Sequence, residues 1–237
     1  MSITLRLHSC VIIKAVNTKR LKRFIASLPK NSRFWILALA VTLSVNIAGF
    51  VQLTIPPGSL QIIRIEQWYG FIALLLLYLA VLASPLTKVI PKLPAKEAYL
   101  HARRAIGVSA FYYAFLHVWL TFFKQLDGFG GIKYLNHTYS LSLLGGVFAL
   151  AILFIMAATS LDIAVRRMGY KHWKLLHRLV YLACLALLLH VMLIGPHYDA
   201  APTALGVLTY LAAAFLVILE ALRIRLAIKT RKKQRHV

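Results

Sequence analysis

Long apolar stretches, separated by short polar segments, dominate the hydrophobic pattern of this 237-residue chain. Six of them reach the roughly 17–25 residues that a helix needs to cross the hydrocarbon core of a bilayer. The pattern predicts an all-α polytopic membrane protein, a bundle of six transmembrane helices. The expected spans are residues 34–55, 68–84, 101–123, 140–161, 173–194 and 203–222.

Proline and glycine mark the ends of several stretches. Pro56-Pro57-Gly58 follows the first, Ser84-Pro85 is expected to end the second, and Gly195-Pro196 the fifth. The first stretch is too long for the apolar region of a signal peptide, so we expect it to be retained. Residues 1–33 form a basic N-terminal segment, either a short helix on an anionic leaflet or a tail. The predicted domains are this segment, the transmembrane domain 34–222 and the basic tail 223–237.

The charge of the chain points to membrane topology. The sequence holds 28 Lys and Arg against six Asp and Glu, and 60% of its residues are hydrophobic. A net charge of +22 is also typical of nucleic-acid binding, but the basic residues are confined to short runs between apolar spans. Of the 28, 25 lie on one side of the predicted membrane. Positive residues mark the cytoplasmic side, which predicts that both termini of the six-span chain are cytoplasmic.

Three histidines lie well inside the predicted spans, and His101 is the first residue of the third. His117 is on the third span, and His177 and His190 are on the fifth, thirteen residues apart. Both spans run outward, so His117 and His190 fall at similar depth. Two level imidazoles from neighbouring helices can supply the two axial ligands of a six-coordinate haem iron. We therefore expect His117 and His190 to hold a haem towards the outer face.

His177 lies near the cytoplasmic end of the fifth span and needs a partner at its own depth. His101 is the candidate, although it precedes His117 by sixteen residues where His177 precedes His190 by thirteen. The difference is about 4.5 Å of helical rise, which a tilt can absorb. Alternatively, His101 is an interfacial residue. The sequence thus allows one haem or two.

Weaker signals surround the inner histidine. Gly107 lies near the level of His177, where a missing side chain would admit a macrocycle or simply allow close helix packing. Arg103, Arg104 and Arg178 line the inner rim, where they can pair with haem propionates or a flavin phosphate. Positive-inside topology alone also accounts for most of these arginines.

Other chemistries fit less well. A zinc site needs three or four ligands at one point, which these depths do not supply. A proton relay normally adds acids inside the spans, whereas Asp162 and Glu220 fall at cytoplasmic ends and Glu66 at the outer rim. Histidines that are merely hydrogen-bonded inside a haem-free scaffold or transporter are the remaining alternative.

The residues resemble a known family. The resemblance rests on the motifs Arg103-Arg104-Ala-Ile-Gly107, Phe-Leu-His117, Trp173-Lys-Leu-Leu-His177-Arg-Leu-Val-Tyr181 and His190. Over about residues 68–222 the chain resembles the ferric-reductase-like transmembrane domain family, and within it the haem-binding membrane subunits of periplasmic methionine-sulfoxide reductase systems. The resemblance implies haem b bound by His117 and His190, with His177 also a haem ligand. It further implies bound FMN, electrons from a cytosolic flavin reductase, and delivery to a periplasmic molybdopterin-containing reductase.

The functional expectation is an electron-transfer subunit of an oxidoreductase system, with catalysis on the final substrate elsewhere. The chain ends about fifteen residues after the sixth span and carries no G-x-G-x-x-G fingerprint in a βαβ setting, so we expect a separate flavoprotein or a quinol to supply electrons. The alternative within the same family is a haem protein that reduces iron, another metal or oxygen.

Overall fold

The computed structural model describes residues 32–194 and 203–235, and every regular element in those ranges is helical. In chain order these are α2 (Ser32–Thr54), α3 (Ser59–Val89), α4 (Lys96–Leu120), the π-helical turn η1 (Thr121–Gln125), α5 (Phe129–Ile132), α6 (His137–Ala158), α7 (Asp162–Met168), α8 (Tyr170–Leu176), the 3₁₀ turn η2 (His177–Leu179), α9 (Val180–Ile194) and α10 (Ala204–Arg235).

Six helical segments are long and apolar enough to cross a membrane, which confirms the all-α, six-span prediction. These segments are Ser32–Thr54, Ser59–Val89, Lys96–Gln125, His137–Ala158, Tyr170–Ile194 and Gly206–Thr230. Together with the family described below, they make the chain a multi-pass membrane protein. The predicted N-terminal segment 1–33 lies almost entirely outside the described residues.

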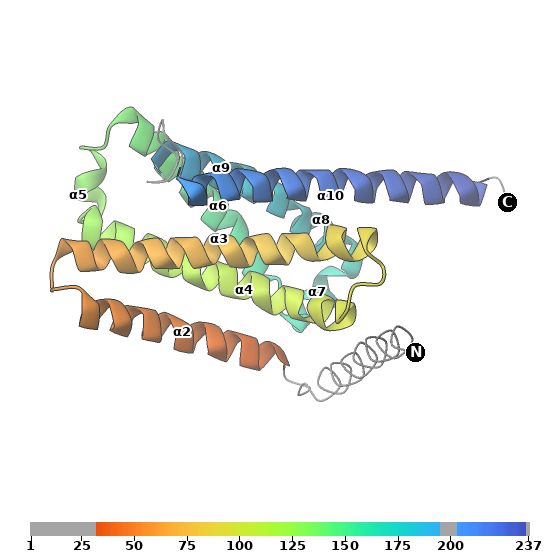
Figure 1. Cartoon of the computed structure of the whole chain (residues 1–237), viewed down its shortest axis with the longest axis horizontal. Coiled ribbons are helices and arrows are strands. Elements are labelled where there is room, and N and C mark those ends of the chain that lie inside the picture. Colours follow the sequence, from red (N-terminus) through yellow and green to blue (C-terminus); the bar gives the residue numbers. More distant parts are fainter. Residues whose placement is uncertain (1–31, 195–202, 236–237) are drawn as a thin grey trace, which may run out of the picture.

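The helices pack in neighbouring pairs. α3 packs mainly along α4, and α6 packs mainly along α9, while α2 covers α4 and α10 lies against α3. In Figure 1 the α3–α4 connection, α7 and α8 gather at one end of the bundle, and the α2–α3 link and α5 at the other. The end with the α3–α4 connection, α7 and α8 carries the basic loops. This is expected, because successive spans run in opposite directions and every second loop therefore lies at the same end.

Buried tyrosines join α2 to the rest of the bundle. The hydroxyl of Tyr113 on α4 donates to the carbonyl of Ala40 at 2.8 Å, and that of Tyr69 on α3 donates to the carbonyl of Ser44 at 2.9 Å. Tyr113 is completely buried. A phenol inside an apolar bundle needs such an acceptor, so these bonds fix the position of α2.

One predicted helix end is wrong. Ser84-Pro85 does not stop α3, which continues to Val89 with Pro85 buried inside it. Proline has no backbone N–H to donate to the preceding turn of the helix. Polar side chains nevertheless bind other carbonyl groups in the same turns of α3. Thr87 donates to the carbonyl of Ala83 at 2.7 Å, and Nε of Arg103 donates to the carbonyl of Ala80 at 2.8 Å.

The sixth span also continues beyond its predicted end. α10 runs to Arg235, so the described part of the basic tail prolongs the helix. Figure 1 shows this helix projecting past the other helices at the basic end of the bundle. Lysine and arginine favour helix and keep their charges in water, which allows the helix to extend beyond the apolar segment.

Candidate haem site

His117 and His190 face each other across the interior of the bundle. His117 lies in the last turns of α4, and His190 lies near the end of α9. Their ring centres are 6.3 Å apart, and their planes are inclined at 82°. The structure therefore brings together the two imidazoles that the depth argument paired.

A backbone carbonyl from a neighbouring helix orients each ring. Nδ1 of His117 lies 3.1 Å from the carbonyl oxygen of Glu66 on α3. Nδ1 of His190 lies 2.9 Å from the carbonyl oxygen of Ser142 on α6 and 3.0 Å from the hydroxyl of the same serine. A carbonyl can only accept, so each Nδ1 carries the proton and donates. Each neutral ring is then left with an Nε2 lone pair, the nitrogen that a metal would bind.

The distance between the rings fits a haem iron between them. A metal–imidazole bond is about 2 Å long and a ring centre lies about 1 Å from its nitrogen, so two imidazoles that bound one iron would have ring centres up to roughly 6 Å apart. The observed 6.3 Å agrees with that spacing. The described residues contain no cluster of three or more His, Cys, Asp or Glu side chains that could hold another kind of metal ion.

Two glycines support the rings, and the sequence reasoning missed both. A Cβ atom on Gly70 of α3 would lie 3.0 Å from Nδ1 of His117, and a Cβ atom on Gly146 of α6 would lie 3.0 Å from Nδ1 of His190. Contacts that short are rarely adopted, so any larger residue would push the ring aside. The sequence does show a glycine inside each of the two neighbouring apolar spans. It does not show how each helix is rotated about its axis, and that rotation determines which glycine faces a histidine.

Glu66 is the second feature that the sequence reasoning misjudged. It is buried in α3, and a carboxylate oxygen lies 3.5 Å from Nδ1 of His117. Its carboxylate accepts hydrogen bonds from Thr121, at 3.0 Å, and from Gln125, both on η1. The residue is therefore not a rim acid but part of a polar cluster beside the ring, between α3 and the end of the third span.

His177 occupies a different environment at the basic end of the same long segment. Its Nε2 lies 3.4 Å from the hydroxyl of Thr159, and its ring packs against Trp173 with centres 4.2 Å apart. The indole of Trp173 donates to the carbonyl of Thr159 at 3.1 Å. His101 is exposed on α4, and no ring contact or hydrogen bond joins it to His177 within residues 32–194.

Arg103 and Arg104, at the basic end of the bundle, bind other parts of the protein. Arg103 bonds the hydroxyl of Ser84 at 2.7 Å in addition to the α3 carbonyl described above. Arg104 pairs with Asp162 at 2.5 Å, and its guanidinium lies 5.3 Å from the ring centre of Trp173. Hydrogen bonds from Arg33 and then Arg104 hold the pKa of the Asp162 carboxyl below its usual value.

Gly107 and Arg178 complete the predicted set. A Cβ atom on Gly107 would meet only Cβ of Ala80, at 3.9 Å, so this glycine is in ordinary contact with α3. Arg178 lines an open groove along α8 and α9. The structure thus joins His117 with His190, surrounds His177 with Thr159 and Trp173, and leaves His101 apart from them.

A helical membrane bundle with two facing imidazoles, each oriented by a backbone carbonyl, is the arrangement expected of a transmembrane haem-binding protein. The model of the ferric reductase like transmembrane component family matches residues 62–188, more than half of the chain, and the chain belongs to that family. Its relatives include the protein-methionine-sulfoxide reductase heme-binding subunit MsrQ of Ralstonia nicotianae, 29% identical over 66% of this chain and 69% of the relative. MsrQ of Rhodospirillum rubrum is 36% identical over 57% of this chain and 62% of its own length. MsrQ of Brucella ovis is 27% identical over 73% and 76%.

Proposed function

We propose that this protein is a haem b electron-transfer subunit that passes electrons across the inner membrane to a methionine-sulfoxide reductase. The observation that carries the proposal is the His117–His190 pair, whose ring centres lie 6.3 Å apart with both Nδ1 atoms bound to carbonyl groups. The relatives support it because they are named heme-binding subunits of that reductase system.

His117 and His190 would hold the iron through Nε2, and the carbonyls of Glu66 and Ser142 fix the two rings in the required tautomer. A haem held by both histidines would supply reversible one-electron transfer rather than a site for oxygen or substrate. Gly70 and Gly146 allow the rings to approach their helices closely. These residues make the site suited to electron transfer, with catalysis on a separate subunit.

The wider arrangement is also proposed. With 25 of the 28 basic residues on one side, the termini and the α7–α8 region would be cytoplasmic and the His117–His190 pair would lie towards the periplasm. A cytosolic flavin reductase or a quinol would supply electrons, with FMN as a bound carrier. The acceptor would be a periplasmic molybdopterin-containing reductase. His177 would belong to an inner centre, which makes a second haem part of the proposal.

The visible spectrum of the purified protein tests the core of the proposal. We expect a Soret band and split α and β bands on reduction, and we expect His117→Ala and His190→Ala each to lose the outer low-spin haem. His137→Ala, an exposed histidine at the start of α6, is the matched control and should keep it. Unchanged haem content in both site variants would contradict the assignment, and a wild-type protein without haem would leave the scaffold or transporter alternative.

A further inference from the structure

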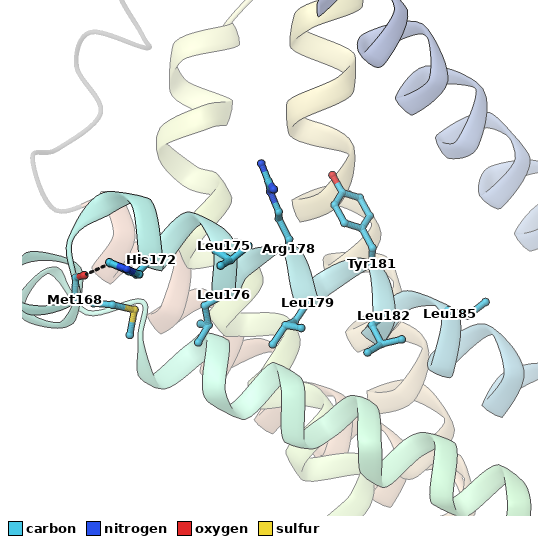
Figure 2. A pocket seen from close by; sticks show the side chains of 9 residues that line it. All are labelled: Met168, His172, Leu175, Leu176, Arg178, Leu179, Tyr181, Leu182 and Leu185. Atoms are coloured by element: carbon cyan, nitrogen blue, oxygen red, sulfur yellow. Dashed lines mark hydrogen bonds between the residues drawn. The ribbon is translucent and has the colours of Figure 1, made fainter.

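An open groove of about 740 Å³ runs along one side of α8, η2 and α9, from Met168 to Leu185 (Figure 2). Its walls are leucines, together with Met168, His172, Arg178 and Tyr181. In Figure 2 Arg178 and Tyr181 follow one edge, and Leu179 and Leu182 point the other way. The groove is therefore apolar along its length, with a cation on one edge.

The leucine wall of the groove lies mainly on the side of the helix that faces away from His177. At about 100° per residue, Leu175, Leu179 and Leu182 fall within about 40° of the side opposite His177. These three leucines are 61%, 38% and 44% exposed, although they belong to a membrane-spanning segment. A surface of this kind faces the bilayer, so its occupant must come from within the membrane.

Arg178 is the unusual residue of this surface. It is eight residues past Tyr170, the start of the span, or about 12 Å along the helix. Within residues 32–194 and 203–235 its guanidinium makes no hydrogen bond and no ion pair. Tyr181 does not help, because its hydroxyl donates to Glu220 on α10 at 3.1 Å, and that carboxylate is paired with Arg223. A cation at the edge of the hydrocarbon region needs a counter-ion.

We propose that the groove is a binding site for an anionic phospholipid. The lipid phosphate would pair with Arg178 in the planar, two-bond manner that guanidinium favours. One acyl chain would follow Leu179, Leu182 and Leu185 towards the middle of the membrane. A neutral quinol would fill the same leucine surface and could accept a hydrogen bond, but it would bring no negative charge to the guanidinium, which is why the charge favours a phospholipid.

The site would act on the inner histidine through the backbone. η2, residues His177–Leu179, is the 3₁₀ interruption between α8 and α9, and both His177 and Arg178 belong to it. A bound headgroup would hold this interruption from the lipid side, opposite the Thr159 and Trp173 contacts of His177. The lipid site itself depends only on the membrane fold and does not require the proposed haem function.

Lipid retention tests the site on the full-length protein in nanodiscs. The discs contain phosphatidylcholine with a minor fraction of phosphatidylglycerol, and native mass spectrometry counts the lipids that stay bound. We expect the wild type to retain phosphatidylglycerol in preference to phosphatidylcholine. Arg178→Gln should weaken that retention about fivefold, the effect of about one basic residue at a membrane surface.

Lys174→Gln is the matched control, because Lys174 is an exposed cation one turn earlier on α8 that does not line the groove. It should retain phosphatidylglycerol as the wild type does. Leu182→Trp fills the groove without altering its charge and should no longer retain phosphatidylglycerol. This variant tests the site independently if Arg178→Gln does not fold. Wild-type retention in Arg178→Gln and Leu182→Trp, or an equal loss in Lys174→Gln, would overturn the site. Displacement of the lipid by decylubiquinone at equal concentration would overturn it in favour of a quinone site.

Discussion

Nδ1 of His117 lies 3.0 Å from the point that a Cβ atom on Gly70 would occupy. Gly146 stands in the same relation to His190, also at 3.0 Å, and each Nδ1 binds a carbonyl on the helix that supplies the glycine. Both rings are therefore held by a neighbouring helix in the same way. The glycine allows the approach, and the carbonyl fixes the tautomer that leaves Nε2 for a metal.

Replacing these glycines should disturb the haem site. In Gly70→Ala and Gly146→Ala the new methyl group displaces a ligand ring, and crowding of this kind typically costs about 1–3 kcal/mol. We expect the haem-to-protein ratio of each variant to fall by at least half, with an altered low-spin signal in the haem that remains. Pyridine haemochrome and electron paramagnetic resonance measure both quantities.

Gly107→Ala is the control for the glycine variants, because its Cβ would meet only Ala80 at an ordinary 3.9 Å. It should keep the haem content and spectrum of the wild type. A result in which all three alanine variants behave alike would show that the glycines near the histidines have no special part in orienting the rings.

Glu66 should tune the site without being needed to assemble it. Its carbonyl, which orients His117, remains in Glu66→Gln, whereas the carboxylate 3.5 Å from Nδ1 is lost. Removing a negative charge near the iron destabilises the oxidised form, because that form carries the extra positive charge. We expect haem content to persist and the midpoint potential to rise by several tens of millivolts, on the scale of 59 mV per tenfold change for one electron.

Redox titration of Glu66→Gln beside Gln67→Ala measures this effect. Gln67 is the next residue on α3 and is exposed, so its replacement should leave the potential where it is. A potential that is equal in the wild type and both variants would mean that the Glu66 carboxyl carries no charge that the iron senses.

Much of the helical scaffold follows from the sequence because lipid imposes a simple rule on length and apolarity. The six spans and the depth of His117 and His190 are examples. The end of α3 was missed because Pro85 is buried inside the helix, beside Arg103 of α4, which binds the carbonyl of Ala80 and the hydroxyl of Ser84; such contacts depend on tertiary structure. Gly70 and Gly146 were missed for a related reason. Depth along each helix can be counted in residues, but the rotation that turns a glycine towards a histidine cannot.

Asp162 should contribute to stability in a pH-dependent way. Arg33 on α2 and Arg104 on α4 bind it from two helices, and they lower the pKa of its carboxyl in the folded protein. A lowered folded pKa means that the stabilisation is complete above the unfolded value of about 3.9 and is lost as the pH falls through the folded value. We therefore expect acidification below about pH 4 to cost the wild type more thermal stability than it costs Asp162→Asn.

Melting temperatures of the purified proteins, measured from neutral pH into this acid range, test the expectation. Asp127→Asn is the control, since Asp127 is exposed in the loop before α5 and its positive φ of 50° suits asparagine. It should follow the wild-type curve. If the Asp162→Asn and wild-type curves run parallel throughout, the links to Arg33 and Arg104 do not stabilise the fold.

His177 gives the last prediction. His177 contacts Thr159 and Trp173, whereas His101 is exposed and has no contact with it in the described ranges. If the protein binds two haems, His177→Ala should reduce the pyridine haemochrome stoichiometry from two to one while the spectrum of the outer haem persists. His101→Ala should leave the stoichiometry unchanged, because an interfacial imidazole is not needed to hold an iron. A fall from two haems to one in His101→Ala would instead identify it as the partner ligand, and it would require the start of α4 to tilt towards His177 when haem binds.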